Sequence, residues 1–339
     1  MLSSVRRILA LAACCGFVLT LSGAAVAQFY THSNLVSNLT GKAKHQDVLL
    51  KNPWGLAYGP GAPFWVSDQA SGWSTLYDGQ GNPQALQVTV PPATGTGPGK
   101  PTGIVFNGSS EFQIDTWPSA FLFATRDGTI SGWSHFFPSA ALIGVTHAGA
   151  VYNGLAITNR VSGNLLYAAD TANNKVDVYD ASFNLVNSFT DPAVPAGFAV
   201  FGIQDIGGKV YVTFANTAGK TNGYIDIFTE AGVLVKHFAH GAPLNQAWGL
   251  AVAPSNFGPL SGTLLVSNNT GTGTINGFNL TTGKFVDSIK NSAGTAIVIN
   301  GLWGIEFGGG TAANGNTNQL FYTAGPKDSD GYFGVINAH

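Results

Sequence analysis

A glycine-centred apolar segment returns six times along the chain, and this repeat constrains the fold more than any other feature. The copies read PWGLA, PTGIV, YNGLA, VFGIQ, AWGLA and LWGIE, and their glycines are Gly55, Gly103, Gly154, Gly202, Gly249 and Gly304. The intervals between these glycines are 48, 51, 48, 47 and 55 residues. A near-constant period of this length is typical of an array of small sheets, each of which must pack against its neighbours.

Each copy continues with the same order of short β-branched and aromatic runs, bounded by Gly, Asn, Asp and Pro. The second runs are FWVSD (64–68), FLFAT (121–125), LLYAAD (165–170), KVYVTF (209–214), TLLVSN (263–268) and QLFYTA (319–324). A third run follows in all six copies. A fourth, more polar run follows in five copies: ALQVTV (85–90), ALIGVT (141–146), LVNSF (185–189), LVKHF (234–238) and FVDSI (285–289). This composition is typical of strands and turns, and no convincing helical period occurs after residue 28.

The repeat predicts an all-β fold, a six-bladed β-propeller of four-stranded blades. The blades are expected to start near residues 52, 100, 151, 199, 246 and 301. The sixth copy ends at His339 directly after its third strand, so its fourth strand must come from elsewhere. Residues 29–38, FYTHSNLVSN, are the obvious donor. An outer strand from the other end of the chain closes the ring and leaves no open joint.

The first 27 residues have the pattern of a secretory signal peptide. Arg6 and Arg7 precede an apolar stretch, and AVA at 25–27 is a small-x-small cleavage site, so cleavage is expected after Ala27. This predicts a secreted or periplasmic protein in which residues 28–339 form a single propeller domain. In an alternative interpretation LAAC (11–14) is a lipobox with Cys14 lipidated, although apolar residues continue to Leu21 where a lipoprotein would have a polar tether. Both cysteines of the chain lie in this leader, so the expected mature chain has no disulfide.

Charged residues make up only 9% of the sequence. Without Arg6 and Arg7, 13 Lys and Arg remain against 17 Asp and Glu, a net charge of −4. The sequence shows no basic patch, which argues against nucleic acid or an anionic membrane surface as partner. After residue 28, no segment is long and apolar enough to cross a bilayer. The expected partner is a small molecule, a glycan or a protein, bound at the rim of a monomer.

The segment YAADTANNKVDVYD (167–180) resembles an NHL-type propeller repeat. More widely, the chain resembles a family of uncharacterised secreted bacterial propeller proteins. The matching stretches include NPWGLAYGPGAPFWVSD, FLFATRDGTISGWS, INGLWGIEFG and YTAGPKDSDGYFG. The resemblance implies the fold but no established activity. Related six-bladed propellers include lactonases, lyases and strictosidine-synthase-like enzymes alongside binding modules, so the fold alone does not select a function.

Connectivity places the start of each first strand and the end of each second strand on one face of the disc, at a mouth of the central channel. The residues expected to bind a ligand there are Asn52, Trp54, Asp68, Asn153, Asp170, Trp248, Asn268, Asn300 and Trp303. The aromatic members allow two interpretations. They either wedge between adjacent blades, as aromatic residues of repeats commonly do, or line a mouth that stacks a sugar or another ring.

Asp68, Asp170 and Asn268 occupy the same repeat position in alternate blades. Oxygen ligands that converge on an axis would suit Ca²⁺, the one cofactor that the sequence suggests. Alternatively, each side chain caps the turn that follows it, as Asp and Asn readily do.

No catalytic motif is found in the sequence, and the catalytic residues stay unassigned. There is no HExxH segment and no Gly-x-Ser-x-Gly elbow. Strict strand alternation would place His237 and His240 on opposite faces of an outer strand, which argues against a ligand pair there. With no embedded cluster of ionisable groups visible, a non-catalytic binding propeller is the first hypothesis. A metal-assisted hydrolase or lyase of the lactonase-like propeller type is the second, and a structural envelope or matrix component is the third.

Overall fold

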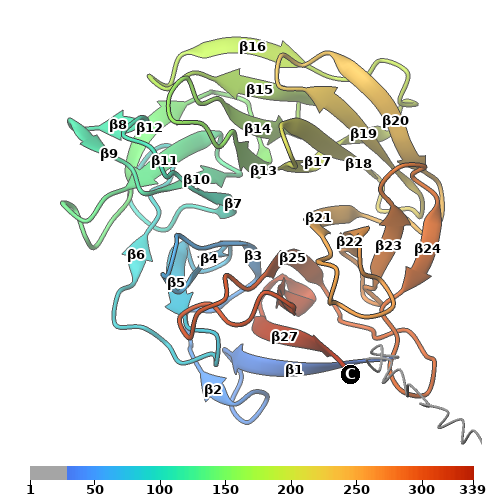
Figure 1. Ribbon diagram of the computed structural model, residues 1–339. Coiled ribbons are helices and arrows are strands. Elements are labelled where there is room, and N and C mark those ends of the chain that lie inside the picture. Colours follow the sequence, from blue (N-terminus) through green and yellow to red (C-terminus); the bar gives the residue numbers. More distant parts are fainter. Residues whose placement is uncertain (1–28) are drawn as a thin grey trace, which may run out of the picture.

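Six antiparallel sheets stand as blades around a central axis in the computed structural model, which describes residues 29–339 (Figure 1). Five sheets have four strands, and the sixth has four plus a short added strand. The predicted six-bladed propeller of four-stranded blades is therefore confirmed. The predicted signal peptide (1–27) lies outside the described residues. None of the described helices is long and apolar enough to span a membrane.

The innermost strand of each blade carries the repeated glycine. In blade order these first strands are β3 (Pro53–Ala57), β7 (Pro101–Phe106), β13 (Tyr152–Ile157), β17 (Phe198–Asp205), β21 (Ala247–Val252) and β25 (Leu302–Phe307). A methyl group on Gly55 would lie 2.6 Å from the carbonyl oxygen of Thr102 in the next blade. One on Gly304 of blade 6 would lie 2.7 Å from the carbonyl oxygen of Trp54 in blade 1. The glycines are thus required by close approach of neighbouring backbones, all the way around the ring.

The middle strands of each blade are almost completely buried. The second strands are β4 (Phe64–Asp68), β10 (Phe121–Thr125), β14 (Leu166–Asp170), β18 (Lys209–Asn216), β22 (Thr263–Asn268) and β26 (Gln319–Ala324). The third strands are β5 (Trp73–Tyr77), β11 (Thr129–Trp133), β15 (Lys175–Tyr179), β19 (Gly223–Thr229), β23 (Ile275–Asn279) and β27 (Tyr332–Ala338). Their side chains fill the spaces between blades. Phe64 of blade 1, for example, packs on Phe321 of blade 6 with ring centroids 4.5 Å apart.

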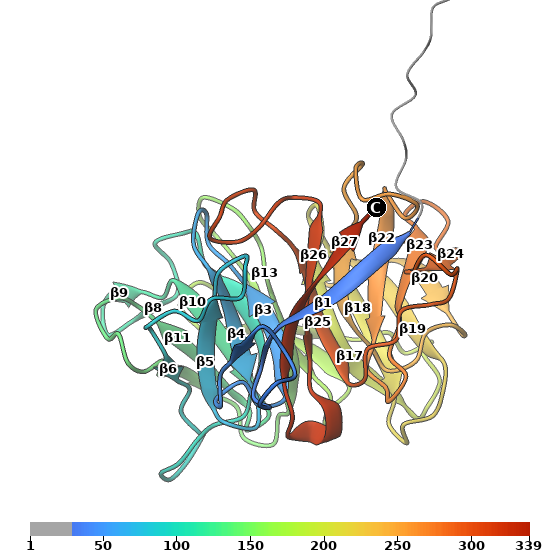
Figure 2. The same ribbon diagram turned by 90° about the horizontal axis from the view of Figure 1, so that it is seen from below.

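The outer strands are more exposed, as their polar sequences predict. They are β6 (Val88–Thr89), β12 (Leu142–Thr146), β16 (Leu185–Phe189), β20 (Leu234–His240) and β24 (Phe285–Ser288) for blades 1–5, and β1 (Tyr30–Ser37) for blade 6. β1 runs antiparallel to β27, from the pair Tyr30 and Ala338 to the pair Ser37 and Tyr332 (Figure 2). The N-terminal segment therefore supplies the missing strand of the last blade, as predicted.

Three short elements depart from the repeat. β2 (His45–Gln46) pairs in parallel with β1 at the outer edge of blade 6. A hairpin of β8 (Gln113–Ile114) and β9 (Trp117–Pro118) is inserted in the chain between β7 and β10, the first two strands of blade 2. The only helical element of residues 29–339 is the 3-10 turn η1 (Pro326–Asp328), which follows β26. β2 and the hairpin lie on the outside of the ring, whereas η1 contributes Asp328 to one mouth of the channel.

Candidate functional site

Four aromatic side chains, Trp54, Phe201, Trp248 and Trp303, meet inside the channel and form what we call the aromatic plug. Each precedes the repeated glycine of a first strand, in blades 1, 4, 5 and 6. Trp54 stacks on Trp303 with ring centroids 3.6 Å apart, and Trp248 meets both edge-on at 6.2 and 5.8 Å. The three Trp side chains are almost fully buried. The rings therefore pack on one another across the axis, a third arrangement besides the predicted blade wedge and the predicted open aromatic mouth.

A cavity of about 410 Å³ lies at the mouth where the first strands begin, and we call it the entry mouth. It is lined by Asn52, Trp54, Gln69, Arg126, Asn153, Phe201, Asn269, Trp303 and Asp328. Arg126 lies in the turn between β10 and β11, and its guanidinium carbon is 5.9 Å from the centre of the Trp54 ring. The entry mouth thus combines an exposed cation, Arg126, and an exposed carboxylate, Asp328, with amide groups and an aromatic floor. Pockets of this size and chemistry accommodate small organic molecules.

Two asparagines at the entry mouth are buried and rigidly held. Asn52 adopts a φ of +45°, which Asn tolerates better than most residues. Its Nδ2 donates to Gln69 Oε1 (2.8 Å), and its Oδ1 accepts from Trp303 Nε1 (3.2 Å). Asn153 donates from Nδ2 to Thr171 Oγ1 (2.8 Å). These bonds fix the orientation of both amide groups before any ligand binds.

Two buried polar atoms of the entry mouth have no hydrogen-bond partner among residues 29–339. They are Asn153 Oδ1 and Trp54 Nε1, on side chains that are each 4% exposed. A buried polar atom without a partner costs about 1–3 kcal/mol, so an acceptor and a donor are held ready at this mouth at a cost in stability. Such atoms require an explanation, and a bound ligand or water supplies one.

Four of the nine predicted site residues line the entry mouth together: Asn52, Trp54, Asn153 and Trp303. Trp248 lies in the aromatic plug and lines the narrow interior of the channel. The remaining four do not line this cavity: Asp68, Asp170, Asn268 and the exposed Asn300. The structure therefore brings together residues at the start of the first strands of blades 1, 3 and 6, but not those that end the second strands.

Asp68, Asp170 and Asn268 each make local hydrogen bonds. Asp170 accepts from the backbone N–H groups of Val151 and Asn173 at 3.0 and 3.3 Å. Asn268 accepts from Asn245 N (3.0 Å) and donates to Pro243 O (2.8 Å).

Asp68 accepts from Thr75 Oγ1 (2.8 Å), and full burial raises its pKa well above the ordinary value. Desolvation favours the neutral form of a carboxyl over the charged form, and the neutral form is the poorer calcium ligand. Together with the local bonding of Asp170 and Asn268, this gives the predicted Ca²⁺ site no support.

Five residues that line the entry mouth are absent from the predicted set. Two of them are Phe201 and Asp328, and the other three lie one position beyond the end of a second strand. Gln69, Arg126 and Asn269 each directly follow the last residue of a second strand. Because side chains alternate along a strand, the last strand residue points into the blade and the next one is free to turn toward the channel. The signal was therefore present in the repeat, displaced by a single position.

A second cavity, of about 570 Å³, opens at the opposite end of the first strands, and we call it the exit mouth. Its ionisable side chains are Tyr58, Arg160, Asp205, Glu230 and Glu306. Arg160 and Glu230 form an ion pair. The sequence shows no embedded cluster of ionisable groups, and the exit mouth corrects that expectation. The detectable signal was Glu306, which stands two residues after a repeated glycine where the other blades have Ala, Val or Gln.

Glu306 is the exit-mouth residue best suited to proton transfer. Desolvation raises the pKa of Glu306 to about 7, although a backbone hydrogen bond from Phe307 opposes this. Desolvation, with a smaller contribution from the Glu306 charge, raises the pKa of Tyr58 to about 12. Glu306 also lines the channel interior beneath the exit mouth. A carboxyl that titrates near neutral pH in an open cleft can accept and return protons efficiently.

Comparison with known proteins places the chain beside viral relatives. Protein R648 of Acanthamoeba polyphaga mimivirus is 31% identical over 330 residues, which covers 89% of this chain and 78% of the relative. Protein L690 of the same virus is 30% identical over 296 residues, covering 80% and 77% respectively. No family model matches the chain.

Among solved structures, a gluconolactonase from Xanthomonas campestris superposes with a TM-score of 0.55 at 14% identity, covering 86% of this chain and 88% of that one. A streptogramin B lyase superposes with a TM-score of 0.54 at 11% identity, covering 91% and 98%. At these identities the likeness shows the shared propeller fold.

Proposed function

We propose that this chain, which belongs to the family of the mimivirus proteins R648 and L690, is a binding propeller. Its entry mouth would bind a small, polar, anionic molecule. The observation that carries the proposal is the unpartnered Oδ1 of buried Asn153 in the same cavity as the Arg126 guanidinium. Asn153 Oδ1 calls for a hydrogen-bond donor on the ligand. Arg126 and the Trp54 N–H call for acceptors, of which a carboxylate is the best suited.

A hydroxy acid or an acidic sugar carries both kinds of group on a scaffold small enough for the entry mouth. Its hydroxyl would donate to Asn153 Oδ1 while its carboxylate accepts from Arg126. A neutral sugar of the same size would leave Arg126 unpaired, and a purely apolar ligand would leave both buried atoms unpartnered. We therefore expect the entry mouth to bind acidic carbohydrates more tightly than neutral ones.

The proposal is tested by calorimetric titration with a panel of hydroxy acids, sugar acids and the corresponding neutral sugars. We expect the acids to bind and Arg126→Gln to weaken that binding at least ~10-fold, because a charged hydrogen bond is worth about 1.5–3 kcal/mol. Arg160→Gln, the same substitution at the exit mouth, is the matched control and should leave the affinity unchanged. Equal losses in the two variants, or acids that bind no better than neutral sugars, would exclude the entry mouth as the anion site.

We further propose that the protein is secreted as a monomer, with residues 28–339 as one domain after cleavage at Ala27. Support comes from the pattern of residues 1–27 and from the low content of charged residues. The NHL-type character of the repeats and the bacterial provenance implied by the resemblance stay predictions, since the relatives found are viral. Mass spectrometry of the exported protein would check the cleavage site.

One observation favours a second candidate function, hydrolase or lyase chemistry at the exit mouth. Glu306 has a pKa of about 7 there, and two proteins of the same fold are named a gluconolactonase and a streptogramin B lyase. Ionised Glu306 could act as a general base toward water or a substrate proton. A metal-assisted version gains no support from Asp68, Asp170 and Asn268, whose oxygens are buried or used locally.

An assay of gluconolactone opening distinguishes this second candidate from the first. If Glu306 is the base, the rate rises with pH through about 7, and Glu306→Gln abolishes it. Arg126→Gln should leave the rate unchanged, because that residue lines the other mouth. Activity that survives in Glu306→Gln would remove the proposal.

A further inference from the structure

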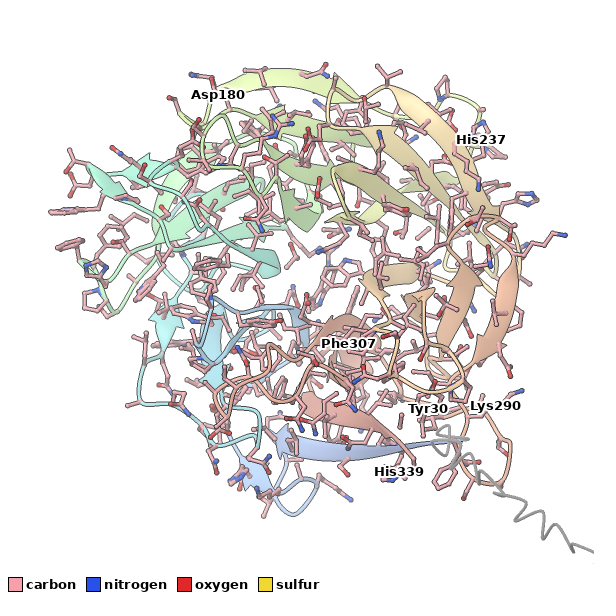
Figure 3. The ribbon with its side chains drawn as sticks, in the orientation of Figure 1. Tyr30, Asp180, His237, Lys290, Phe307 and His339 are labelled. Atoms are coloured by element: carbon pink, nitrogen blue, oxygen red, sulfur yellow. The ribbon has the colours of Figure 1, made fainter. Side chains whose placement is uncertain are left out.

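Three ligand-type side chains meet on the outer edge of blade 4, away from both mouths of the channel. They are Asp191, from the loop that joins blades 3 and 4, Asp226 of β19 and His237 of β20. Figure 3 shows His237 at the periphery of the disc. Their ligand atoms all lie within 4.8 Å of one another, and no other described group of three or more His, Cys, Asp or Glu residues does so. We call this group the rim triad.

The rim triad has more acceptors than donors. His237 Nδ1 lies 3.1 Å from Asp226 Oδ1 and 3.0 Å from Asp191 Oδ2, but only the contact with Asp226 has hydrogen-bond geometry. One ring nitrogen can donate one proton at most. The Oδ2 atoms of both aspartates have no hydrogen-bond partner among residues 29–339, and the two residues are only 3% and 1% exposed. Two buried carboxylates side by side without a cation are strongly disfavoured.

A β-bulge brings His237 into the rim triad. Asp226 pairs with His237 and Tyr224 pairs with His240, so Phe238 and Ala239 together lie opposite the single residue Ile225, and β20 has one extra residue. Tyr224 and Asp226 are two residues apart on β19 and face the same side, and their partners therefore do too. This corrects the expectation that strict alternation separates His237 from His240. Both histidines line one cavity of about 260 Å³ beside the triad.

The equivalent positions in blades 3 and 5 show how the polar side chain at this position is paired in the neighbouring blades. In blade 3, Asp177 accepts from Ser188 Oγ at 2.6 Å and lies 2.8 Å from Lys175 Nζ. In blade 5, Asn276 accepts from Ser288 Oγ at 2.7 Å. In both sites a side-chain oxygen accepts from a cross-strand serine, and the aspartate has a compensating lysine. In blade 5, Asn276 Nδ2 has no partner among residues 29–339. Blade 4 has histidine in place of that serine, has no lysine at this point and adds a second carboxylate.

We propose that Asp191, Asp226 and His237 bind a divalent transition-metal ion such as Zn²⁺. An imidazole nitrogen with two carboxylate oxygens suits Zn²⁺ better than Ca²⁺ or Mg²⁺, which prefer oxygen ligands alone. Ligands about 2.0 Å from a tetrahedral ion lie roughly 3.3 Å apart, close to the 3.0 and 3.1 Å between His237 Nδ1 and the two carboxylates. The side chain of His237 is 57% exposed, so solvent can complete the coordination sphere from the adjoining cavity.

The experiment uses the full chain, stripped with a chelator and titrated with ZnCl₂ by calorimetry, with MnCl₂ and CaCl₂ as comparators. His237→Ser copies the serine that blades 3 and 5 carry, and Asp226→Asn copies Asn276, so both variants should fold. His240→Ser is the matched control, because His240 lines the same cavity without belonging to the rim triad. Circular dichroism before titration verifies that each variant retains the wild-type sheet content.

We expect one Zn²⁺ per wild-type chain, bound more tightly than Ca²⁺. His237→Ser and Asp226→Asn should weaken Zn²⁺ binding at least ~100-fold, which exceeds the effect typical of residues that only hydrogen-bond to a metal ligand. His240→Ser should change the affinity less than ~3-fold. The proposal is overturned if the wild-type protein shows no saturable Zn²⁺ binding. It is also overturned if His237→Ser retains the affinity, or if His240→Ser loses as much as His237→Ser, because the ion would then bind elsewhere.

Discussion

Trp54 of the first blade and Trp303 of the last blade stack with their ring centroids 3.6 Å apart. A side-chain to backbone bond also crosses this joint, because Thr323 Oγ1 of blade 6 donates to Trp54 O of blade 1 at 2.5 Å. The equivalent bond from Ser267 Oγ to Trp303 O, also 2.5 Å, joins blades 5 and 6. The joint between the two ends of the chain is therefore sealed at the axis by the aromatic plug, and at the periphery by β1. Both seals join residues far apart in sequence, so closure of the ring depends on non-local contacts.

Trp303→Ala should destabilise the protein by about 3–5 kcal/mol, the usual cost of deleting a large buried aromatic side chain. It removes the stack on Trp54 and the Nε1 hydrogen bond to Asn52. Urea unfolding followed by far-UV circular dichroism measures the loss. Trp117→Ala is the control, since Trp117 is 41% exposed on the β9 hairpin, and it should cost less than ~1 kcal/mol. Similar costs for the two would show that the aromatic plug does not hold the ring together.

Gly55→Ala should cost about 2 kcal/mol through overpacking. A methyl group there would lie 2.6 Å from Thr102 O and 2.9 Å from Ile104 N, both of them backbone atoms of the next blade that cannot rotate away. Gly271→Ala provides the comparison, because nothing lies within 4 Å of its added methyl group, and should change stability by less than ~0.5 kcal/mol. Equal unfolding midpoints for the two variants would contradict the close packing of first strands.

The fold was predictable because each blade solves the same physical problem with the same local sequence. β4, β10, β22 and β26 begin and end at the residues predicted, since continuous apolar runs between turn residues are needed for strands buried on both faces. The exception is informative. ALQVTV (85–90) forms a strand only at Val88–Thr89, because an outer strand is paired along one edge alone and its sequence pattern constrains it less.

The candidate sites were less predictable, since they depend on how blades face each other rather than on local pattern. The aromatic plug needed four blades to converge on the axis, which no single repeat encodes. The repeat points to Asp68, which ends a strand, although the following residue, Gln69, is the one that lines the entry mouth. Strict alternation separates His237 from His240, because a β-bulge is invisible in a pattern of alternation.

Stability should fall with rising pH through the titration of Glu306. Its pKa in the folded protein is about 7, above its ordinary value of 4.5, so the folded state holds this proton more tightly than the unfolded state. The resulting stabilisation is complete below pH ~4.5 and is lost as pH rises through ~7. Glu306→Gln should therefore match the wild type within ~0.5 kcal/mol at pH 4.5 and exceed its stability by about 2 kcal/mol at pH 8. Urea unfolding at both pH values is the measurement, and a pH-independent difference would show that the carboxyl is not desolvated.

The same substitution in two neighbouring blades should have opposite consequences. In chelated protein at pH 8, Asp177→Asn should destabilise by about 1–3 kcal/mol, because it strands Lys175 and weakens the bond from Ser188. Asp226→Asn should be neutral or stabilising by up to ~1 kcal/mol, because it relieves a carboxylate that lies against Asp191 with no lysine to balance it.

Added Zn²⁺ should stabilise Asp177→Asn but not Asp226→Asn. The wild type and Asp177→Asn should gain stability with increasing Zn²⁺ concentration, since an ion that binds only the folded state stabilises it by mass action. Asp226→Asn should show no such gain. Thermal melts across a Zn²⁺ series give the comparison. A Zn²⁺-dependent rise in the Asp226→Asn midpoint equal to that of the wild type would mean that Zn²⁺ binds outside the rim triad.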